Sequence, residues 1–389
     1  MDYYKKALEL HEKYKGKIDI KCDMPLNNRE DLAVAYTPGV AQPCLEIAKD
    51  PENAYKYTSK GHLVAIVTDG SAVLGLGNIG GMAGMPVMEG KAALFKRFGG
   101  VDGFPICLST QNTEEIIAAV RAIAPTFGGI NLEDISAPRC FEIEERLEHE
   151  LDIPVFHDDQ HGTAIVVTAA LINALKIVGK EMKDIKVALS GPGAAGTAII
   201  KMLQHCGVKN IVACDSRGII FRGREGLDAH KTLLAQTTNP ENTSGSLADA
   251  DHENDDYVGD SAPGILTAEM VKTMAEKPVI FAMANPVPEI GYEEALAAGA
   301  AVVGTGRSDF PNQINNVLAF PGIFRGALDC GAREINYDMK TAAAAAIAEL
   351  VLPEQLSPEY IIPDPFDPRV AENVARRVAE AAVATGAVR

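Results

Sequence analysis

The sequence predicts an α/β protein built on parallel sheets. Three observations support this class: short apolar runs alternate with helical stretches, a glycine turn joins a β-branched strand to a helix, and acidic residues gather where strands end. Alternation of strands and helices is typical of parallel sheets, whose crossovers are helices. A chain of 389 residues has room for two or three domains.

The first predicted domain covers residues 1–160 and is expected to bind the substrate. Its apolar runs HLVAIVTDG, DGFPICLS and PVFHDD have the composition of strands, and helical stretches such as NTEEIIAAVRAIA separate them. A first GxGxxG motif occurs at Gly75, Gly77 and Gly80. Because Pro86 delays any helix and no acidic residue closes a following strand, we interpret this motif as a tight loop that shapes a cleft.

The second predicted domain covers residues 161–310 and binds a dinucleotide. A long apolar helix leads into KVALSGPGAAGTAIIKML and NIVACDSRG, which form a strand, glycine turn, helix and strand. This order predicts a Rossmann-type unit in which the helix N-terminus receives the diphosphate. The predicted cofactor-binding residues of this turn are Gly191, Gly193, Ala194, Ala195 and Gly196.

Asp215 ends the next strand of this unit and is a further predicted cofactor-binding residue. A carboxylate at that place accepts hydrogen bonds from the adenosine ribose and disfavours an added 2′-phosphate, which favours NAD. Arg217 follows two residues later and can pair with a 2′-phosphate. The cofactor is therefore predicted to be NAD or NADP.

The remaining residues complete the predicted architecture. Residues 236–262 are polar and acidic and predict a surface excursion. In the third segment, 311–389, helical stretches at 341–352 and 368–386 flank a proline-rich linker. We expect these helices to pack back on a domain or on a second subunit.

Composition excludes several classes of protein. The net charge of −17 argues against a nucleic-acid partner, because phosphate contacts need clustered Lys and Arg. We find no signal peptide and no uncharged apolar run long enough to cross a membrane, so we expect a cytoplasmic protein with no membrane partner. The seven scattered cysteines predict reduced structural thiols.

Two acidic pairs follow predicted strands, Glu133 with Asp134 and Asp158 with Asp159. Because strand ends meet at the carboxyl edge of a parallel sheet, these pairs can share one crevice, where three or four oxygens suit Mg²⁺ or Mn²⁺. The alternative is that they are solvated turn or N-cap residues. His157 and His161 lack the HExxH pattern of a zinc site, and we interpret them as structural groups that orient the carboxylates.

Eight blocks, in order, resemble the signatures of malic enzymes, particularly the short prokaryotic form: YTPGVA, VTDGSAVLGLGNIG, EGKAALF, NLEDI, HDDQHGTA, LSGPGAAGTA, FAMANPVPE and QINNVLAFPG. The resemblance implies oxidative decarboxylation of malate to pyruvate and carbon dioxide, with reduction of NAD or NADP and a divalent metal. It implies that Glu133, Asp134 and Asp159 are the metal ligands and that Asn285 and Asn315, with Asn316 as a neighbour, contact the substrate carboxylate.

The resemblance also implies the acid and the base. Tyr36 is then the general acid that protonates C3, and Lys91 is the general base that contacts the substrate, with Asp158 tuning it. Because partial desolvation beside a cation lowers the pKa of an amine, we expect Lys91 to act in its neutral form. Larger malic enzymes have an arginine after TDG, whereas this chain has Ser71, Ala72 and Val73. The family also has an apolar strand before SAPG, which residues 256–260 interrupt in this chain, so its place in the cofactor sheet is doubtful.

Two alternatives stay open. A malolactic enzyme shares these blocks but retains the nicotinamide and releases lactate. A non-catalytic dinucleotide sensor is the more distant alternative, although a sensor has no need of both Tyr36 and Lys91. The helical N-terminus and the apolar tail helices indicate a homodimer.

Overall fold

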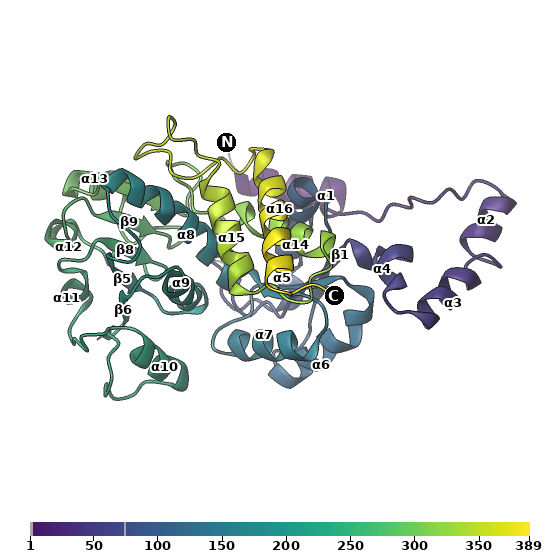
Figure 1. Ribbon diagram of the computed structural model, residues 1–389, viewed down its shortest axis with the longest axis horizontal. Helices are drawn as coiled ribbons and strands as arrows, with labels where there is room; N and C mark the ends of the chain where they lie inside the picture. The colour runs from purple at the N-terminus through teal and green to yellow at the C-terminus, as the bar shows by residue number, and fades with distance from the viewer. Residues whose placement is uncertain (1–2, 74) are drawn as a thin grey trace.

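The computed structural model describes residues 3–73 and 75–389. It contains two separate sheets, which confirms the α/β class. The first has the strand order β2-β1-β3-β4 and the second has the order β10-β9-β8-β5-β6-β7. Helix α8 (Asp158–Val178) starts directly after the last strand of the first sheet and leads to the second (Figure 1).

All four strands of the first sheet are parallel: β1 (Leu63–Thr68), β2 (Asp102–Cys107), β3 (Gly129–Leu132) and β4 (Val155–His157). Its crossovers are α5 (Gly81–Leu94), η2 (Phe95–Gly99), α6 (Thr113–Ile123), η3 (Ala124–Thr126) and α7 (Arg139–Glu150). The expectation that Pro86 delays the helix was wrong, because α5 starts at Gly81 and contains Pro86. The hydrogen bond that Pro86 lacks would go to the carbonyl of Met82, an exposed residue.

The second sheet is a Rossmann-type sheet. Its strands are β5 (Lys186–Ser190), β6 (Asn210–Asp215), the short antiparallel β7 (Gly218–Ile219), β8 (Asp256–Gly259), β9 (Val279–Ala282) and β10 (Val302–Thr305). Its helices are α9 (Ala194–His205), α10 (Ala229–Thr237), α11 (Leu247–Asp251), α12 (Ala268–Thr273) and α13 (Tyr292–Ala298).

The doubt about the strand before SAPG was misplaced. Strand β8 lies inside the sheet and pairs in parallel with both β5 and β9. All four of its residues are buried, including the side chain of Asp256. The surface excursion predicted for residues 236–262 therefore ends before β8, and a polar sequence conceals a core strand.

The C-terminal segment packs back on the body as expected, with one helix more than the sequence analysis found. Its elements are η4 (Asn316–Leu318), α14 (Phe320–Asp329), α15 (Tyr337–Ala348) and α16 (Arg369–Ala384). Helices α14 and α15 both pack on α16, and α15 also packs on α8. Helix α8 has the length and apolar composition of a membrane span, but 78% of that window is buried inside the protein, as in a core helix.

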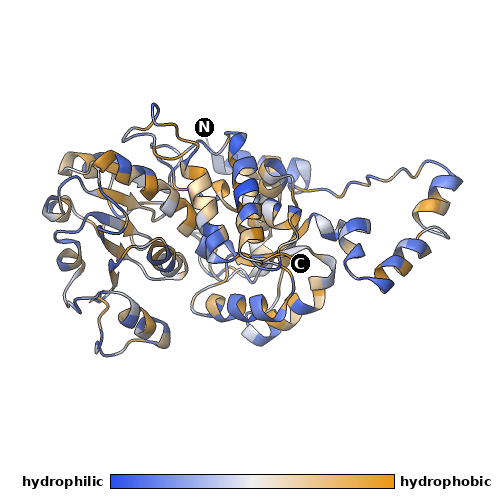
Figure 2. Ribbon diagram, in the orientation of Figure 1, coloured by the Kyte–Doolittle hydropathy of each residue, from blue (hydrophilic) through white to orange (hydrophobic). Residues whose placement is uncertain are grey.

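The N-terminal elements are α1 (Tyr3–Tyr14), α2 (Arg29–Ala35), α3 (Ala41–Lys49), α4 (Asn53–Tyr57) and η1 (Ser59–Gly61). The segment that follows α1 forms, together with α2 and α3, an arm that extends away from the sheets (Figure 1). Apolar and polar residues alternate along this arm (Figure 2). None of the residues of α1 to α4 is buried, and large apolar side chains such as Leu32 and Val34 are exposed.

Candidate active site

An acidic cluster forms where β3 and β4 end. Glu133 and Asp134 follow β3, and Asp159 lies in the first turn of α8, directly after β4. Because β3 and β4 are parallel neighbours, their ends bring one carboxylate oxygen of each residue within 4.8 Å of the others. The structure therefore brings together the three predicted metal ligands.

The chemistry of this cluster fits a hard divalent cation. Asp134 Oδ2 is buried and has no hydrogen-bond partner among the described residues. Burial and the neighbouring charges of Asp159 and Glu133 raise the pKa of Asp134 to about 8. Buried oxygens that repel one another in this way are the donor set that Mg²⁺ or Mn²⁺ binds.

Lys91 lies beside the cluster on α5. Its Nζ is 2.9 Å from Glu133 Oε1 and 2.5 Å from Asp158 Oδ2, and it lies 4.2 Å from the centroid of the Phe320 ring. Burial lowers the pKa of Lys91, but the carboxylates of Asp158 and Glu133 outweigh burial and raise it above its usual value. The structure places Asp158 beside the amine of Lys91. The lowering that we expected for the pKa of Lys91 is absent from the protein alone.

A buried network supports the first turn of α8 from behind. Glu144 on α7 accepts hydrogen bonds from the backbone N–H of His157 at 2.7 Å and from Gln160 Nε2 at 2.9 Å, and it lies 3.0 Å from His161 Nε2. Burial lowers the pKa of His161 to about 4, so this imidazole is neutral at physiological pH. His157 Nδ1 lies 3.9 Å from Asp159 Oδ2. The two histidines lie behind the carboxylates, and neither joins the three-residue acidic cluster.

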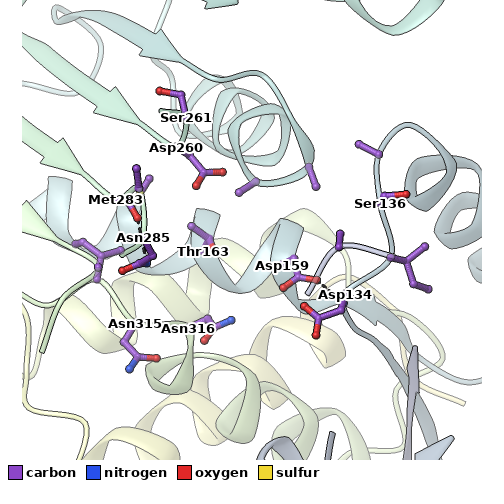
Figure 3. Close-up of a pocket in the computed structure, with 18 residues that line it drawn as sticks. Asp134, Ser136, Asp159, Thr163, Asp260, Ser261, Met283, Asn285, Asn315 and Asn316 are labelled. Carbon is purple, nitrogen blue, oxygen red and sulfur yellow. Dashed lines mark hydrogen bonds between the residues drawn. The ribbon is translucent and has the colours of Figure 1, made fainter. Parts of the chain in front are cut away.

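The predicted substrate contacts lie on a cavity of about 530 Å³ that also reaches Asp134 and Asp159 (Figure 3). Asn316 Nδ2 donates a hydrogen bond to Asp158 Oδ2, and Asn315 Oδ1 accepts one from the backbone N–H of Val317. Asn285 enters the cavity from the loop after β9.

The second glycine motif has the geometry that a dinucleotide needs. Gly191 has a φ of +92°, which favours glycine. A Cβ on Gly196 would collide with the carbonyl oxygen of Gly191, whereas the space beside Gly193, the N-cap of α9, is open. Ala194 and Ala195, in the first turn of α9, line the same cavity as the acidic cluster. A diphosphate bound at this helix N-terminus would lie next to the acidic cluster.

Asp215 is held by cations. Its Oδ1 is 2.5 Å from Arg224 Nη2, its Oδ2 is 2.8 Å from Lys231 Nζ, and it accepts a hydrogen bond from the backbone N–H of Arg217. Burial raises the pKa of Asp215, but the hydrogen bonds from Lys231 and Arg224 prevail and lower it to about 2. The repulsion that we expected Asp215 to exert on a 2′-phosphate is therefore largely offset by its partners.

Tyr36 is the one predicted catalytic residue that lies apart from the others in this chain. It is the C-cap of α2 on the N-terminal arm, and 67% of its surface is exposed. Figure 1 shows α2 at the far end of the arm, well separated from α5 and α8, which carry Lys91 and Asp159. The sequence around Tyr36 gives no sign of this distance, because the distance depends on the direction in which the arm leaves the body.

The cavity residues that sequence analysis missed include Thr163 on α8 and Asp260 after β8. Asp260 had a detectable signal, since it follows an apolar strand core at the carboxyl edge of the sheet. We read it instead as an interruption of that strand.

The fold and the site together define a dinucleotide-binding α/β enzyme with an acidic cluster beside its cofactor cleft. Two family models match the chain: the malic enzyme N-terminal domain over residues 15–148 and the malic enzyme NAD binding domain over residues 160–383. The chain belongs to the malic enzyme family, whose members are NAD- or NADP-dependent oxidoreductases.

Individual relatives agree with this family. The chain is 58% identical to the bifunctional malic/malolactic enzyme of Bacillus subtilis (strain 168), over 100% of this chain and 95% of the relative. It is 60% identical to the NAD-dependent malic enzyme of Geobacillus stearothermophilus, over 96% of this chain and 78% of the relative. The crystal structure of malic enzyme from Pyrococcus horikoshii has a TM-score of 0.95 at 52% identity and covers 99% of this chain and 92% of that one. The resemblance inferred from the eight blocks is confirmed.

Proposed function

We propose that this protein oxidises (S)-malate and decarboxylates it to pyruvate and carbon dioxide, with reduction of NAD or NADP and with Mg²⁺ or Mn²⁺ bound. One observation carries the proposal: Asp134 and Asp159 line a cavity that Ala194 and Ala195 of the dinucleotide turn also line, and Glu133, with Lys91 in contact with it, completes the acidic cluster at this place. The names of the relatives support the same activity.

Glu133, Asp134 and Asp159 hold the cation in this proposal. When bound, a divalent cation supplies a Lewis acid that polarises the C2 oxygen of malate and stabilises the charge that develops after carbon dioxide leaves. A dinucleotide held at the turn of Gly191, Gly193 and Gly196 would supply the acceptor for the hydride from C2. Every other task falls to side chains of the protein.

A divalent cation at the acidic cluster would offset the carboxylates that raise the pKa of Lys91. Lys91 then takes the proton of the C2 hydroxyl in its neutral form. Its Nζ contacts both the ligand Glu133 and the buried Asp158, so the amine is fixed beside the substrate that the cation orients. Asp158 receives a further hydrogen bond from Asn316, which holds the carboxylate on the side of the amine. Asp158 therefore orients Lys91. Asn285 and Asn315 bind the malate carboxylate from the opposite wall of the cavity.

Tyr36 protonates C3 from a second copy of the chain, in a homodimer. The exposed arm supports this part of the proposal, because it carries apolar side chains that a single copy leaves in water. They include Ile20, Met24, Leu26, Leu32, Val34 and Leu45. An arm that crosses to a partner buries these residues and brings a phenol to the partner's site. We further propose that the dimer is soluble and cytoplasmic.

A malolactic activity is the second candidate function. It is favoured by one observation, the 58% identity to a relative named a bifunctional malic/malolactic enzyme. The difference between the two reactions lies in the fate of the reduced nicotinamide, which a malic enzyme releases and a malolactic enzyme uses again on the keto acid.

One assay tests both candidates. Purified protein is given malate and Mn²⁺ with NAD or NADP in parallel, and reduced cofactor, pyruvate and lactate are followed together. Equal amounts of pyruvate and reduced cofactor support the malic enzyme, whereas lactate without net reduced cofactor supports the malolactic enzyme. Dinucleotide binding without any turnover of malate would reject both and favour a sensor.

A further inference from the structure

Asp260 occupies a defined place at the carboxyl edge of the cofactor sheet. It directly follows β8, and its backbone N–H donates a hydrogen bond of 3.0 Å to the carbonyl of Ser190 at the end of β5. The carbonyl of Asp260 lies so close to Gly191 that a Cβ there would collide with it. Asp260 is thus fixed beside the dinucleotide turn.

The order of the strands tells which half of the cofactor Asp260 faces. Asp215 at the end of β6 marks the adenosine side of β5, whereas β8 and β9 lie on the other side. A dinucleotide lies across the sheet at this edge, so its nicotinamide half lies over the loops after β8 and β9. Asp260 and Asn285 line the cavity there, opposite Asp159 of the acidic cluster.

The carboxylate of Asp260 has no counter-charge. Figure 3 shows it pointing into the cavity, and no described residue forms a hydrogen bond or an ion pair with its side chain. It also lies outside the cluster of Glu133, Asp134 and Asp159. Burial and the charges of Glu289 and Asp159 raise the pKa of Asp260 to about 6, so the group is ionised at pH 8. This negative charge would attract a cationic group that binds in the cavity.

We propose that Asp260 makes the site prefer the oxidised dinucleotide over the reduced one. The proposal rests on the proposed function, because it takes the cavity as the nicotinamide site. The oxidised nicotinamide ring carries one positive charge and the reduced ring carries none, while the two diphosphates and the adenosine are the same. A carboxylate beside the ring therefore attracts the oxidised cofactor and favours departure of the reduced one after each turnover.

The test compares the dissociation constants of NAD⁺ and NADH for the wild type and Asp260→Asn, at pH 8 with Mn²⁺ present. NADH is followed by its fluorescence and NAD⁺ by calorimetry, or the NADP pair replaces them if the activity assay shows that it binds more tightly. We expect the ratio of the NADH constant to the NAD⁺ constant to fall by at least tenfold in the variant, because a charge pair about 10 Å apart already contributes more than that factor at an effective dielectric of about 20.

Two further variants separate the charge from other effects. Asp260→Glu keeps the charge and is expected to keep most of the preference. Asp215→Asn removes a charge at the adenosine end, which both cofactors share, and is expected to leave the ratio unchanged. An unchanged ratio in Asp260→Asn, in a wild type that binds both cofactors and oxidises malate, would overturn this inference alone. A wild type that binds neither cofactor would overturn the proposed function with it.

Discussion

The backbone N–H of Asp134 donates a hydrogen bond of 2.7 Å to Asp159 Oδ2. This bond joins the loop after β3 to the first turn of α8, so two of the proposed metal ligands hold each other in place before any ion arrives. Asp134 adopts a left-handed backbone with a φ of +55°, a conformation that aspartate tolerates better than most residues. The cluster is thus preorganised by the main chain.

Binding of Mn²⁺ is expected to release protons and to strengthen as the pH rises. The pKa of Asp134 is raised to about 8, so below pH 8 this carboxyl holds a proton that the metal must displace. The affinity should therefore fall as the pH drops from 8 to 6 and level off above 8. Calorimetry in two buffers of different ionisation enthalpy measures the released protons. In Asp134→Asn the release should shrink and the affinity should drop at least tenfold. Binding that is independent of pH in the wild type would contradict this.

Mixing two inactive variants tests whether Tyr36 acts across subunits. Tyr36→Phe and Lys91→Ala alone should each lose activity by a factor of about 100 or more, because each lacks one proton-transfer group. When the two are unfolded and refolded together, half of the dimers are mixed and each mixed dimer has one complete site, so we expect roughly a quarter of the wild-type activity. Each variant refolded with itself is the control. A mixture that stays inactive would place Tyr36 in the site of its own chain.

Removal of Asp215 should favour NADP. Arg224 and Lys231 now neutralise this carboxylate, and Asp215→Ala frees both cations for a 2′-phosphate. We expect kcat/KM for NADP relative to NAD to rise by about tenfold, which corresponds to ~1.4 kcal/mol. Arg224→Ala in the same background is the matched control and should reverse the gain. Steady-state assays with both cofactors check this, and an unchanged ratio counts against a role for Asp215 at the ribose.

Asp251→Asn should stabilise the protein at alkaline pH. Asp251 is fully buried, and neither carboxylate oxygen has a hydrogen-bond partner among the described residues. Burial raises its pKa from 3.8 to about 7, so the folded protein keeps a proton that the unfolded chain releases. The free energy of unfolding therefore falls as the pH rises from 4 to 7.

Asp251→Asn has no carboxyl group at this position, so its free energy of unfolding does not fall with pH for this reason. Its gain in the free energy of unfolding over the wild type should be larger at pH 8 than at pH 5 by about 2 kcal/mol. Denaturant titrations at the two pH values measure it. Asp309→Asn is a surface control, because the Asp309 side chain is exposed and forms an ion pair with Arg307. A gain equal at both pH values would show that Asp251 does not titrate as described.

The position of acidic residues directly after predicted strands was enough to predict the acidic cluster. Glu133 and Asp159 each follow an apolar strand, and parallel strands must end at the same edge. The same logic failed for β8, because Asp256 reads as a polar surface residue although it is fully buried. Its burial depends on β5 and β9, which lie far away in the sequence.

The position of Tyr36 and the pKa of Lys91 could not be predicted from the sequence. The remote place of Tyr36 follows from the direction of the arm, which no periodicity encodes. The pKa of Lys91 was expected to fall, yet Asp158 and Glu133 raise it, because the protein alone places two carboxylates and no cation beside the amine. Spacing along the chain identifies chemical groups, while their charge balance is fixed only when all neighbours are known.

Helix α8 starts at the acidic cluster and packs on α9, the helix of the dinucleotide turn. In its C-terminal third, Asn173 Nδ2 donates hydrogen bonds of 2.9 Å to the carbonyls of Ala348 and Ile361, which anchors the helix to the C-terminal segment. The separation between the proposed metal ligands and the cofactor turn is therefore set by one rigid helix, α8, with a rise of about 1.5 Å per residue. Inserting a single residue into α8 would rotate the part of the helix after the insertion by about 100°. The two binding sites would then be misaligned, although each would be locally intact.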